Sequence, residues 1–323
     1  MKTREDKNAM QRTGLLRHSP TSRLLTPAPV TIGGIEAFIL LAGSLRPTAL
    51  LTGAGRSVLD LPLEAGYTLQ QHWMMHAERL STLRDRGELP VRILVNEPQH
   101  PATEIKQGAG VRAAFETDPQ EYRGTGGVLR DVVSDYADDS LILVSFAAGL
   151  LMEDIREVVA SLAELESDVA ILTHEDGTAS GPMLIRCGVL RSIADVGFVD
   201  FKEQAIPVIT AQYTVKATAR SVRIPNMRAR AGYLQAVKQY HWHHAGIAES
   251  ADPFVEDWKS SFAVVEPGAK VAATAVIHDS VVLDGGQVDA GAVVVRSVVC
   301  PGGVVVKNET VMDQVVVGRS RGN

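Results

Sequence analysis

Histidine clusters are the first residues of this chain whose types and spacing could support chemistry. The run HWHH at 241–244 holds three histidines in four residues, and His72 and His76 lie one helical turn apart. Zinc binding needs further ligands in a tetrahedral arrangement, and His72 and His76 lack the intervening glutamate of an HExxH motif. We therefore favour a solvent-exposed linker at 241–244 and a packed, half-exposed helix face at His72 and His76 over zinc sites.

Glycine-rich loops are the second such group, because they can present backbone N–H groups to phosphates. The segment TGAGR at 52–56 would form such a nest with Arg56 as its cation, although a plain glycine turn is the favoured interpretation. The segment RGTGG at 123–127 is, taken alone, weak evidence for a nucleotide-binding segment. Neither segment by itself identifies a phosphate site.

Composition excludes several classes of function. The 323 residues include 32 Lys and Arg against 38 Asp and Glu, and a net charge of −6 argues against a dominant nucleic-acid role. Only Cys187 and Cys300 are present, so a disulfide framework is excluded, and both are expected to pack as small apolar groups. No apolar run reaches membrane-spanning length, and the charged N-terminus is unlike a secretory signal. These features predict a cytoplasmic protein without a membrane partner.

Short apolar runs alternate with amphipathic helical patterns over the first two thirds of the chain. This alternation predicts a mostly parallel α/β sheet. The predicted strands are 37–42, 91–95, 141–144 and 168–173, and the predicted helices are 69–84, 152–165 and 233–245. Residues 1–33 mix charge, Ser, Thr and Pro, and we interpret them as a flexible arm.

The last sixty residues carry a repeat of six. An aliphatic residue, Cys or Met recurs at each first position, with one five-residue step after Ile277, and a small or β-branched residue usually follows four positions later. Such hexads predict three triangular turns of a parallel β-helix, and Val-rich antiparallel hairpins are the alternative. The series is Val265, Val271, Ile277, Val282, Val288, Val294, Cys300, Val306 and Met312.

An α/β part followed by hexads resembles the sugar-phosphate nucleotidyltransferase family, which includes mannose-1-phosphate guanylyltransferases and glucose-1-phosphate nucleotidyltransferases. Four further segments match family segments in the same order: FILLAG at 38–43, RGTGGVLRDV at 123–132, VDFKEQAIP at 199–207 and AGYLQAVKQY at 231–240. The resemblance implies a Rossmann-like, GT-A-like mixed-sheet domain over 34–245, a linker over 246–260, a left-handed β-helix over 261–318 and a tail over 319–323.

The resemblance also implies where ligands would bind. In the family, a Gly-rich loop and a GTAGALR-like segment contact the nucleotide. Two carboxylates hold the Mg²⁺ that such an enzyme needs. The implied nucleotide-binding residues here are Gly43, Arg46, Gly124, Thr125, Gly126 and Gly127, and the implied substrate-binding residues are Asp200, Lys202 and Glu203.

The chain departs from the family at the residues that matter for catalysis. Ala148 and Asn226 stand where the family has its metal-binding carboxylates, so neither a metal ligand nor a catalytic residue is assigned. Ser44 replaces a loop glycine, and no lysine lies between Lys7 and Lys106 to supply the family's Pro-Lys lysine. Arg228 and Arg230 would repel a cation but could bind a phosphate.

These departures predict a catalytically impaired member that binds a nucleotide or nucleotide sugar, or that regulates an active paralogue. An alternative is an active enzyme with Mg²⁺ and a remodelled site that uses Arg56, Asp200 or Glu153. Glu153 and Asp154 are, however, expected to begin the next helix, where acidic residues are favoured. A third possibility is a structural oligomer without ligand. A homo-oligomer is expected from the open ends of the β-helix. His278 resembles the base of hexapeptide acyltransferases, but no extended loop accompanies it.

Overall fold

The computed structural model describes most of the chain outside the N-terminal arm. The described ranges are 31–43, 48–84, 86–95, 108–117, 123–195, 197–220, 224–246 and 261–318. Ser44, Arg46, Lys106, most of the predicted arm and most of the predicted linker therefore lie outside the described residues.

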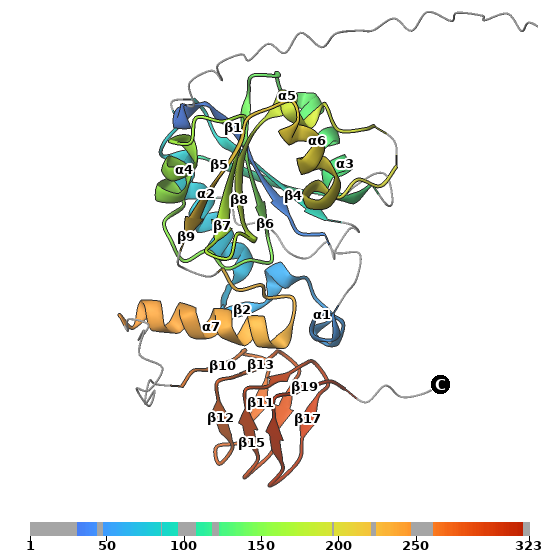
Figure 1. The fold of residues 1–323 in the computed structure, drawn as a ribbon. Helices are drawn as coiled ribbons and strands as arrows, with labels where there is room; N and C mark the ends of the chain where they lie inside the picture. Colours follow the sequence, from blue (N-terminus) through green and yellow to red (C-terminus); the bar gives the residue numbers. More distant parts are fainter. Residues whose placement is uncertain are drawn as a thin grey trace, which may run out of the picture.

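A seven-stranded sheet forms the centre of the larger part (Figure 1). Its strand order is β5-β4-β1-β6-β8-β7-β9. Strand β8 runs antiparallel to β6 and β7, and the other neighbouring pairs are parallel, as the prediction of a mostly parallel sheet requires. The strands are β1 (Ile35–Leu41), β4 (Leu89–Val95), β5 (Val111–Thr117), β6 (Leu141–Phe146), β7 (Val169–His174), β8 (Ala179–Arg186) and β9 (Val215–Arg220).

Helices cover both faces of this sheet because successive side chains of a strand point to opposite faces. Phe38 and Leu40 of β1 belong to one hydrophobic core, and Ile39 and Leu41 belong to the other. The first core includes α2 (Leu69–Ser81) and α4 (Ile155–Ala163), and the second includes α3 (Gly124–Val132), α5 (Cys187–Leu190), a π-helix (Phe201–Ala205) and α6 (Ile206–Thr210). The layers are visible in Figure 1.

Helix α7 (Arg230–His244) lies between the sheet and the C-terminal strands (Figure 1). The short helix α1 (Ala49–Ala54) and the hairpin of β2 (Pro62–Glu64) and β3 (Tyr67–Thr68) lie beside it. Tyr233 of α7 is fully buried and donates a hydrogen bond of 2.7 Å from its hydroxyl to Pro62 O. One hydrophobic core extends from β1 through α7 to Cys300 of the C-terminal strands, so the two parts are packed together.

Residues 261–318 form three parallel sheets, and we call them the coiled region. Their orders are β10-β13-β16-β19, β11-β14-β17 and β12-β15-β18. Val264 pairs with Val281, and Val281 pairs with Val298, so each turn of the chain takes 17 residues. The strands are β10 (Ala263–Val265), β11 (Lys270–Val271), β12 (Val276–His278), β13 (Ser280–Val282), β14 (Gln287–Val288), β15 (Val293–Val295), β16 (Val298–Val299), β17 (Val304–Val305), β18 (Thr310–Met312) and β19 (Val315–Val316).

The 17-residue turn corrects the predicted repeat. A strict step of six after Val294 places Val306 and Met312 inside, but these side chains are 55% and 49% exposed. Val305 and Val311 are buried in their place, because every turn contains one five-residue side. Cys300 is buried as expected, yet it belongs to the core shared with the larger part rather than to the interior of the coiled region.

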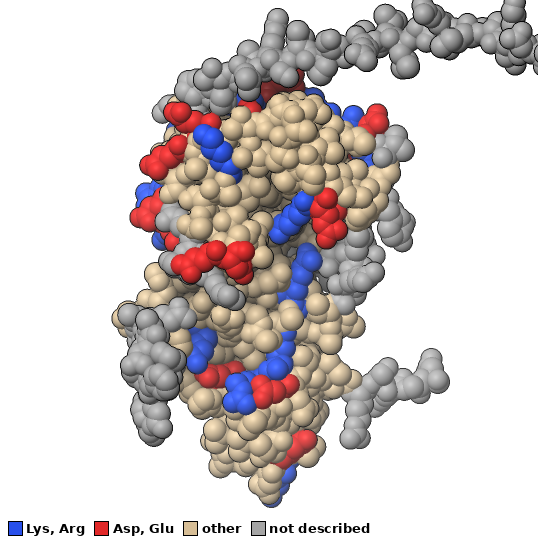
Figure 2. All heavy atoms as spheres, viewed as in Figure 1, with Lys and Arg blue, Asp and Glu red and all other residues tan. Residues whose placement is uncertain are grey.

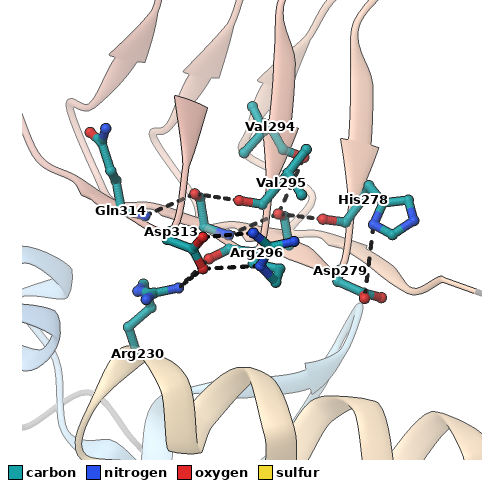
Figure 3. Close-up of polar contacts among 10 residues, drawn as sticks. Arg230, His278, Asp279, Val294, Val295, Arg296, Asp313 and Gln314 are labelled. Atoms are coloured by element: carbon teal, nitrogen blue, oxygen red, sulfur yellow. Dashed lines mark hydrogen bonds and ion pairs between the residues drawn. The ribbon is translucent and has the colours of Figure 1, made fainter. Parts of the chain in front are cut away.

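The five-residue side follows a corner with a left-handed backbone. Asp279, Arg296 and Asp313 occupy this corner in successive turns, with φ of 46°, 44° and 55°. In the first two turns the next residue is a buried serine. The Ser280 hydroxyl accepts a hydrogen bond from Ser297 N at 3.0 Å, and the Ser297 hydroxyl accepts one of 3.0 Å from the N–H of Gln314, which is labelled in Figure 3. These hydroxyls satisfy backbone groups that the corner leaves without strand partners.

Within the described ranges, no helix has the length and apolar character needed to cross a membrane.

Candidate functional site

The candidate site lies where β1 and β6 end at the same edge of the sheet. Ligands of open α/β sheets bind at the carboxyl ends of the strands. Leu41 and Phe146 are paired at this edge, and Gly43 N donates a hydrogen bond of 3.0 Å to Leu94 O of the next strand. The predicted Gly43 therefore lies at a sheet edge that suits ligand binding.

Ala148 and Asn226 are brought close together, as two ligands of one metal would be. Met227 N donates a hydrogen bond of 2.8 Å to Ala148 O, and an isolated antiparallel bridge joins Gly149 to Asn226. Gly232 lets α7 approach this segment, because a Cβ there would lie 2.0 Å from Asn226 O. The residues implied by the resemblance thus form a real pair, far apart in sequence and adjacent in space.

The residues present do not fit a divalent cation. Ala148 is only 4% exposed and offers a methyl group, and the Asn226 side-chain oxygen accepts a hydrogen bond of 3.0 Å from Arg228 N. Mg²⁺ prefers carboxylate oxygens, and a neutral amide that is already hydrogen-bonded is a poor replacement. Across the described part of the chain, no cluster of His, Cys, Asp and Glu could hold a metal ion.

Arg228 places a guanidinium group beside this pair. Its Nη2 donates a hydrogen bond of 2.6 Å to Gly43 O, and its carbonyl accepts a hydrogen bond from the Thr48 hydroxyl that caps α1. Burial lowers the pKa of the Arg228 guanidinium, and its buried Nε lacks a hydrogen-bond partner among the described residues. A cation thus lies beside the positions where the resemblance implies metal-binding carboxylates.

The GTGG segment and the segment at 199–201 are bound to each other. Gly124 has φ +70° and begins α3, and a Cβ there would lie 2.5 Å from Val199 O. Gly126 N donates to Val199 O at 2.9 Å, and the Thr125 hydroxyl oxygen accepts from Phe201 N at 3.0 Å. Gly126 and Gly127 are buried, so this backbone holds the 199–201 segment in place.

The three predicted substrate-binding residues surround the start of the π-helix. Asp200 caps it, with its Oδ1 accepting hydrogen bonds of 2.9 Å from the N–H groups of Lys202 and Glu203. Lys202 extends to β6, where its Nζ lies 4.6 Å from the centre of the Phe146 ring. Loss of hydration lowers the pKa of Lys202, while the charge of Asp200 opposes that shift. The contact with Phe146 is one that sequence spacing gave no means to predict.

Residues of the alternative, remodelled site are engaged elsewhere. Thr52–Ala54 belong to α1 and Gly55 ends it with φ 62°, so TGAGR forms a helix end rather than a phosphate nest. Arg56 forms an ion pair of 2.8 Å with Glu266 of the coiled region. Asp154 caps α4 with a hydrogen bond of 2.9 Å from Arg156 N, as expected, and Glu153 directly precedes it.

His72 and His76 are fully buried, which corrects the prediction of a half-exposed face. Their Nε2 atoms lie 2.7 and 2.9 Å from the same acceptor, Leu151 O. Burial lowers the pKa of His72 to about 4 and that of His76 to about 3. The two imidazoles are therefore neutral and form part of the core.

The HWHH run forms the last turn of α7, so the prediction of an exposed linker is wrong for its first half. The His241 ring stacks on Phe262 with centres 5.7 Å apart, and its Nε2 lies 3.1 Å from Leu63 O. The Lys238 Nζ lies 4.4 Å from the centre of the Trp242 ring. His278 is an exposed corner neighbour, 3.8 Å from Asp279 (Figure 3). No described cluster of ligands supports zinc at any of these histidines.

Two cavities lie away from the carboxyl ends of β1 and β6. One, of about 500 Å³, lies at the opposite end of β1 and is lined by Ile35, Glu36 and Arg84 among others. The second, of about 240 Å³, lies beside α3 and is lined by Arg130, Asp131, Ser134 and Arg191. Their arginines contact backbone carbonyls and acidic side chains, so neither cavity replaces the strand-end site.

Comparisons with known proteins give low similarities. No protein-family model matches the chain, and no curated protein matches it in sequence. Among solved structures, HddC from Yersinia pseudotuberculosis is 15% identical with a TM-score of 0.47, covering 64% of this chain and 100% of that one. A "putative glucose-1-phosphate thymidylyltransferase" from Bacillus anthracis, in complex with sucrose, is 12% identical with a TM-score of 0.47, covering 63% and 94%. With TM-scores under 0.5, these likenesses carry no argument about activity.

Proposed function

We propose that this protein binds a nucleotide or nucleotide sugar at the carboxyl ends of β1 and β6, and that it does not catalyse nucleotidyl transfer. The observation that carries the proposal is the pairing of Ala148 with the Asn226 segment, in the place where the family resemblance implies two metal-binding carboxylates. Transfer between phosphates depends on neutralising charge with a metal ion. A methyl group and an engaged amide cannot hold that ion.

The role that fits such a site is regulatory. A site that has lost the metal-dependent transfer step can still bind the product of that step, a nucleotide sugar. Binding of the nucleotide sugar can then change how this protein contacts an active paralogue. The connection to the rest of the molecule is direct, because Thr48 links Arg228 to α1 and Gly53 of α1 packs against Val317 and Cys300. The protein would then report the level of a nucleotide sugar in the cytoplasm.

The coiled region supports a second element of the proposal. We infer that it is a left-handed hexapeptide-repeat β-helix through which copies of the chain, or a paralogue, assemble. The last turn carries exposed Val304, Val306 and Met312, and its strands end the parallel sheets, so backbone groups there are available for pairing. Light scattering on the purified protein tests assembly, and a monomer at micromolar concentration would contradict it.

Pyrophosphate release and ligand binding, measured together, test the function. Purified protein is incubated with Mg²⁺, each nucleoside triphosphate and a panel of sugar 1-phosphates, and thermal shift is recorded with the matching nucleotide sugars. We expect no turnover and a higher melting temperature with at least one nucleotide or nucleotide sugar. Turnover that is lost in Asp200→Ala would establish the alternative of a remodelled enzyme. No turnover and no binding would favour a structural oligomer without ligand.

A further inference from the structure

We infer that Arg228 takes the charge-neutralising place of a divalent cation, with Lys202 as the second cation, so that the diphosphate group of the ligand binds without metal. This inference rests on the proposed function, because it specifies how the same site holds its ligand. It differs from the family expectation, in which Mg²⁺ carries that charge.

The first support is the position of the Arg228 guanidinium. The backbone N–H of Arg228 donates a hydrogen bond to the Asn226 side-chain oxygen, and its Nη2 donates one to the carbonyl oxygen of Gly43, which follows β1. Arg228 is thus bonded to Asn226 through its backbone and to the end of β1 through its guanidinium. Arginine offers donors in a planar fork that matches two phosphate oxygens, which suits it to a diphosphate.

The second support is the absence of an anion for this arginine. Over the described ranges, Arg228 forms no ion pair with a carboxylate, and burial is the cause that lowers the pKa of its guanidinium. A half-buried cation without a counter-ion is costly, and a bound anion would remove that cost. By contrast, Arg230, only two residues away, forms an ion pair of 3.2 Å with Asp313 and donates to Arg296 O (Figure 3).

The third support is that the Lys202 side chain also reaches the carboxyl ends of β1 and β6. Its Nζ lies over Phe146, the last residue of β6 and the partner of Leu41. The carboxylates nearest to it in sequence are Asp200 and Glu203, and Asp200 already accepts two backbone hydrogen bonds. Figure 2 shows Lys and Arg atoms on one face of the molecule, from the sheet part into the coiled region, with Asp and Glu atoms beside some of them.

The experiment measures binding of inorganic pyrophosphate, and of nucleoside diphosphate sugars, by calorimetry with Mg²⁺ and again with excess EDTA. We expect pyrophosphate to bind in EDTA with a Kd within about threefold of the value in Mg²⁺. Arg228→Gln should weaken binding about tenfold or more, because one charge-assisted contact is lost. Lys202→Gln, at an exposed side chain, should weaken it severalfold without altering the fold.

Arg230→Gln is the matched control. It also removes one positive charge, but Arg230 lies two residues further along the chain and its side chain faces the coiled region. It should bind pyrophosphate as the unaltered protein does. Binding that needs Mg²⁺, or that survives both Arg228→Gln and Lys202→Gln unchanged, overturns the inference.

The two proposals can fail separately. Nucleotide sugars that bind only with Mg²⁺, without any turnover, would leave the proposed function standing and remove this inference. Pyrophosphate that binds in EDTA through Arg228, with no binding by any nucleotide, would keep the anion site and remove the proposed function. Binding of neither ligand overturns both.

Discussion

The amide of Met227 donates a hydrogen bond of 2.8 Å to the carbonyl of Ala148, and this contact joins the end of β6 to the segment that leads into α7. Neighbouring groups are held just as firmly: Trp73 Nε1 donates to Ala147 O at 2.9 Å, and Ala147 N donates to Leu41 O at 3.0 Å. The turn at 146–149 is therefore a fixed part of the core. Its chemistry can be tested by restoring what the resemblance says is missing.

Ala148→Asp should destabilise the protein without creating a metal site. Ala148 is 4% exposed within a hydrophobic core, so an Asp side chain there overpacks its neighbours and loses hydration. The nearby Arg228 guanidinium offsets only part of that cost, because its Nη2 is already bonded to Gly43 O. We expect the free energy of unfolding to fall by about 2 kcal/mol or more. Urea unfolding with and without Mg²⁺ measures this. Ala211→Asp, at an exposed position, is the control. Recovery of stability by Mg²⁺ would show that the position still accepts a cation.

Gly232→Ala should disturb the Asn226 segment. The new Cβ would lie 2.0 Å from Asn226 O, a backbone atom that cannot rotate away. Overpacking of this kind costs about 1–3 kcal/mol, which exceeds the gain of up to about 1 kcal/mol from alanine in a helix. Gly34→Ala is the comparison, because a Cβ at Gly34 meets no atom within 4 Å. Equal stability of the two variants in urea would contradict the close approach of α7.

The buried histidine pair should make stability fall in acid. The pKa values of His72 and His76 are lowered to about 4 and about 3, so the unfolded chain binds protons below pH 6.5 that the folded chain excludes. The stabilisation is present above pH 6.5 and is lost as pH decreases, by at most about 1.4 kcal/mol per pH unit for each histidine.

Urea unfolding between pH 8 and pH 4.5 measures this dependence. The double variant His72→Gln/His76→Gln keeps amide donors near Leu151 O and should show a shallower pH profile than the unaltered chain. His243→Gln, at an exposed histidine of α7, should leave the profile unchanged. Identical profiles for all three proteins would exclude the pair as the source.

Truncation of two adjacent valines of the coiled region should affect stability to very different extents. Val305 is fully buried, and Val306 is 55% exposed. Val305→Ala should lower the free energy of unfolding by about 2 kcal/mol, whereas Val306→Ala should change it by less than about 0.5 kcal/mol. Thermal or urea unfolding of both variants decides the register. The reverse order would restore the strict repeat of six in place of the 17-residue turn.

Local sequence patterns were sufficient for the elements whose apolar residues are buried. Strands such as β1 and β6 were predicted from continuous apolar runs, because both faces of these strands are buried. Helices such as α2 were predicted from period 3.6, because one face of the helix is buried. Strand β5 escaped prediction because five of its seven residues are not buried, so its sequence lacks a clear apolar run. Strand β8 contains Gly181 and Pro182, which are unusual within a strand.

The position of the five-residue step in the coiled region could not be predicted from the sequence repeat. A period of six was visible, but the step of five recurs at each corner residue with positive φ, and Arg296 and Asp313 carry no strong sequence signal for it. Backbone conformation at the corner, rather than hydrophobicity, sets which of two adjacent valines faces inward.

For the candidate site, the types of the residues were evident from the chain and their arrangement was not. The lack of carboxylates at Ala148 and Asn226 followed from aligning motifs. The separation of Arg228 from Arg230 depended on the packing of α7 between the sheet and the coiled region, which turns one arginine to Gly43 and the other to Asp313. Long-range packing decides such directions, because side chains two residues apart near a helix start can face different neighbours.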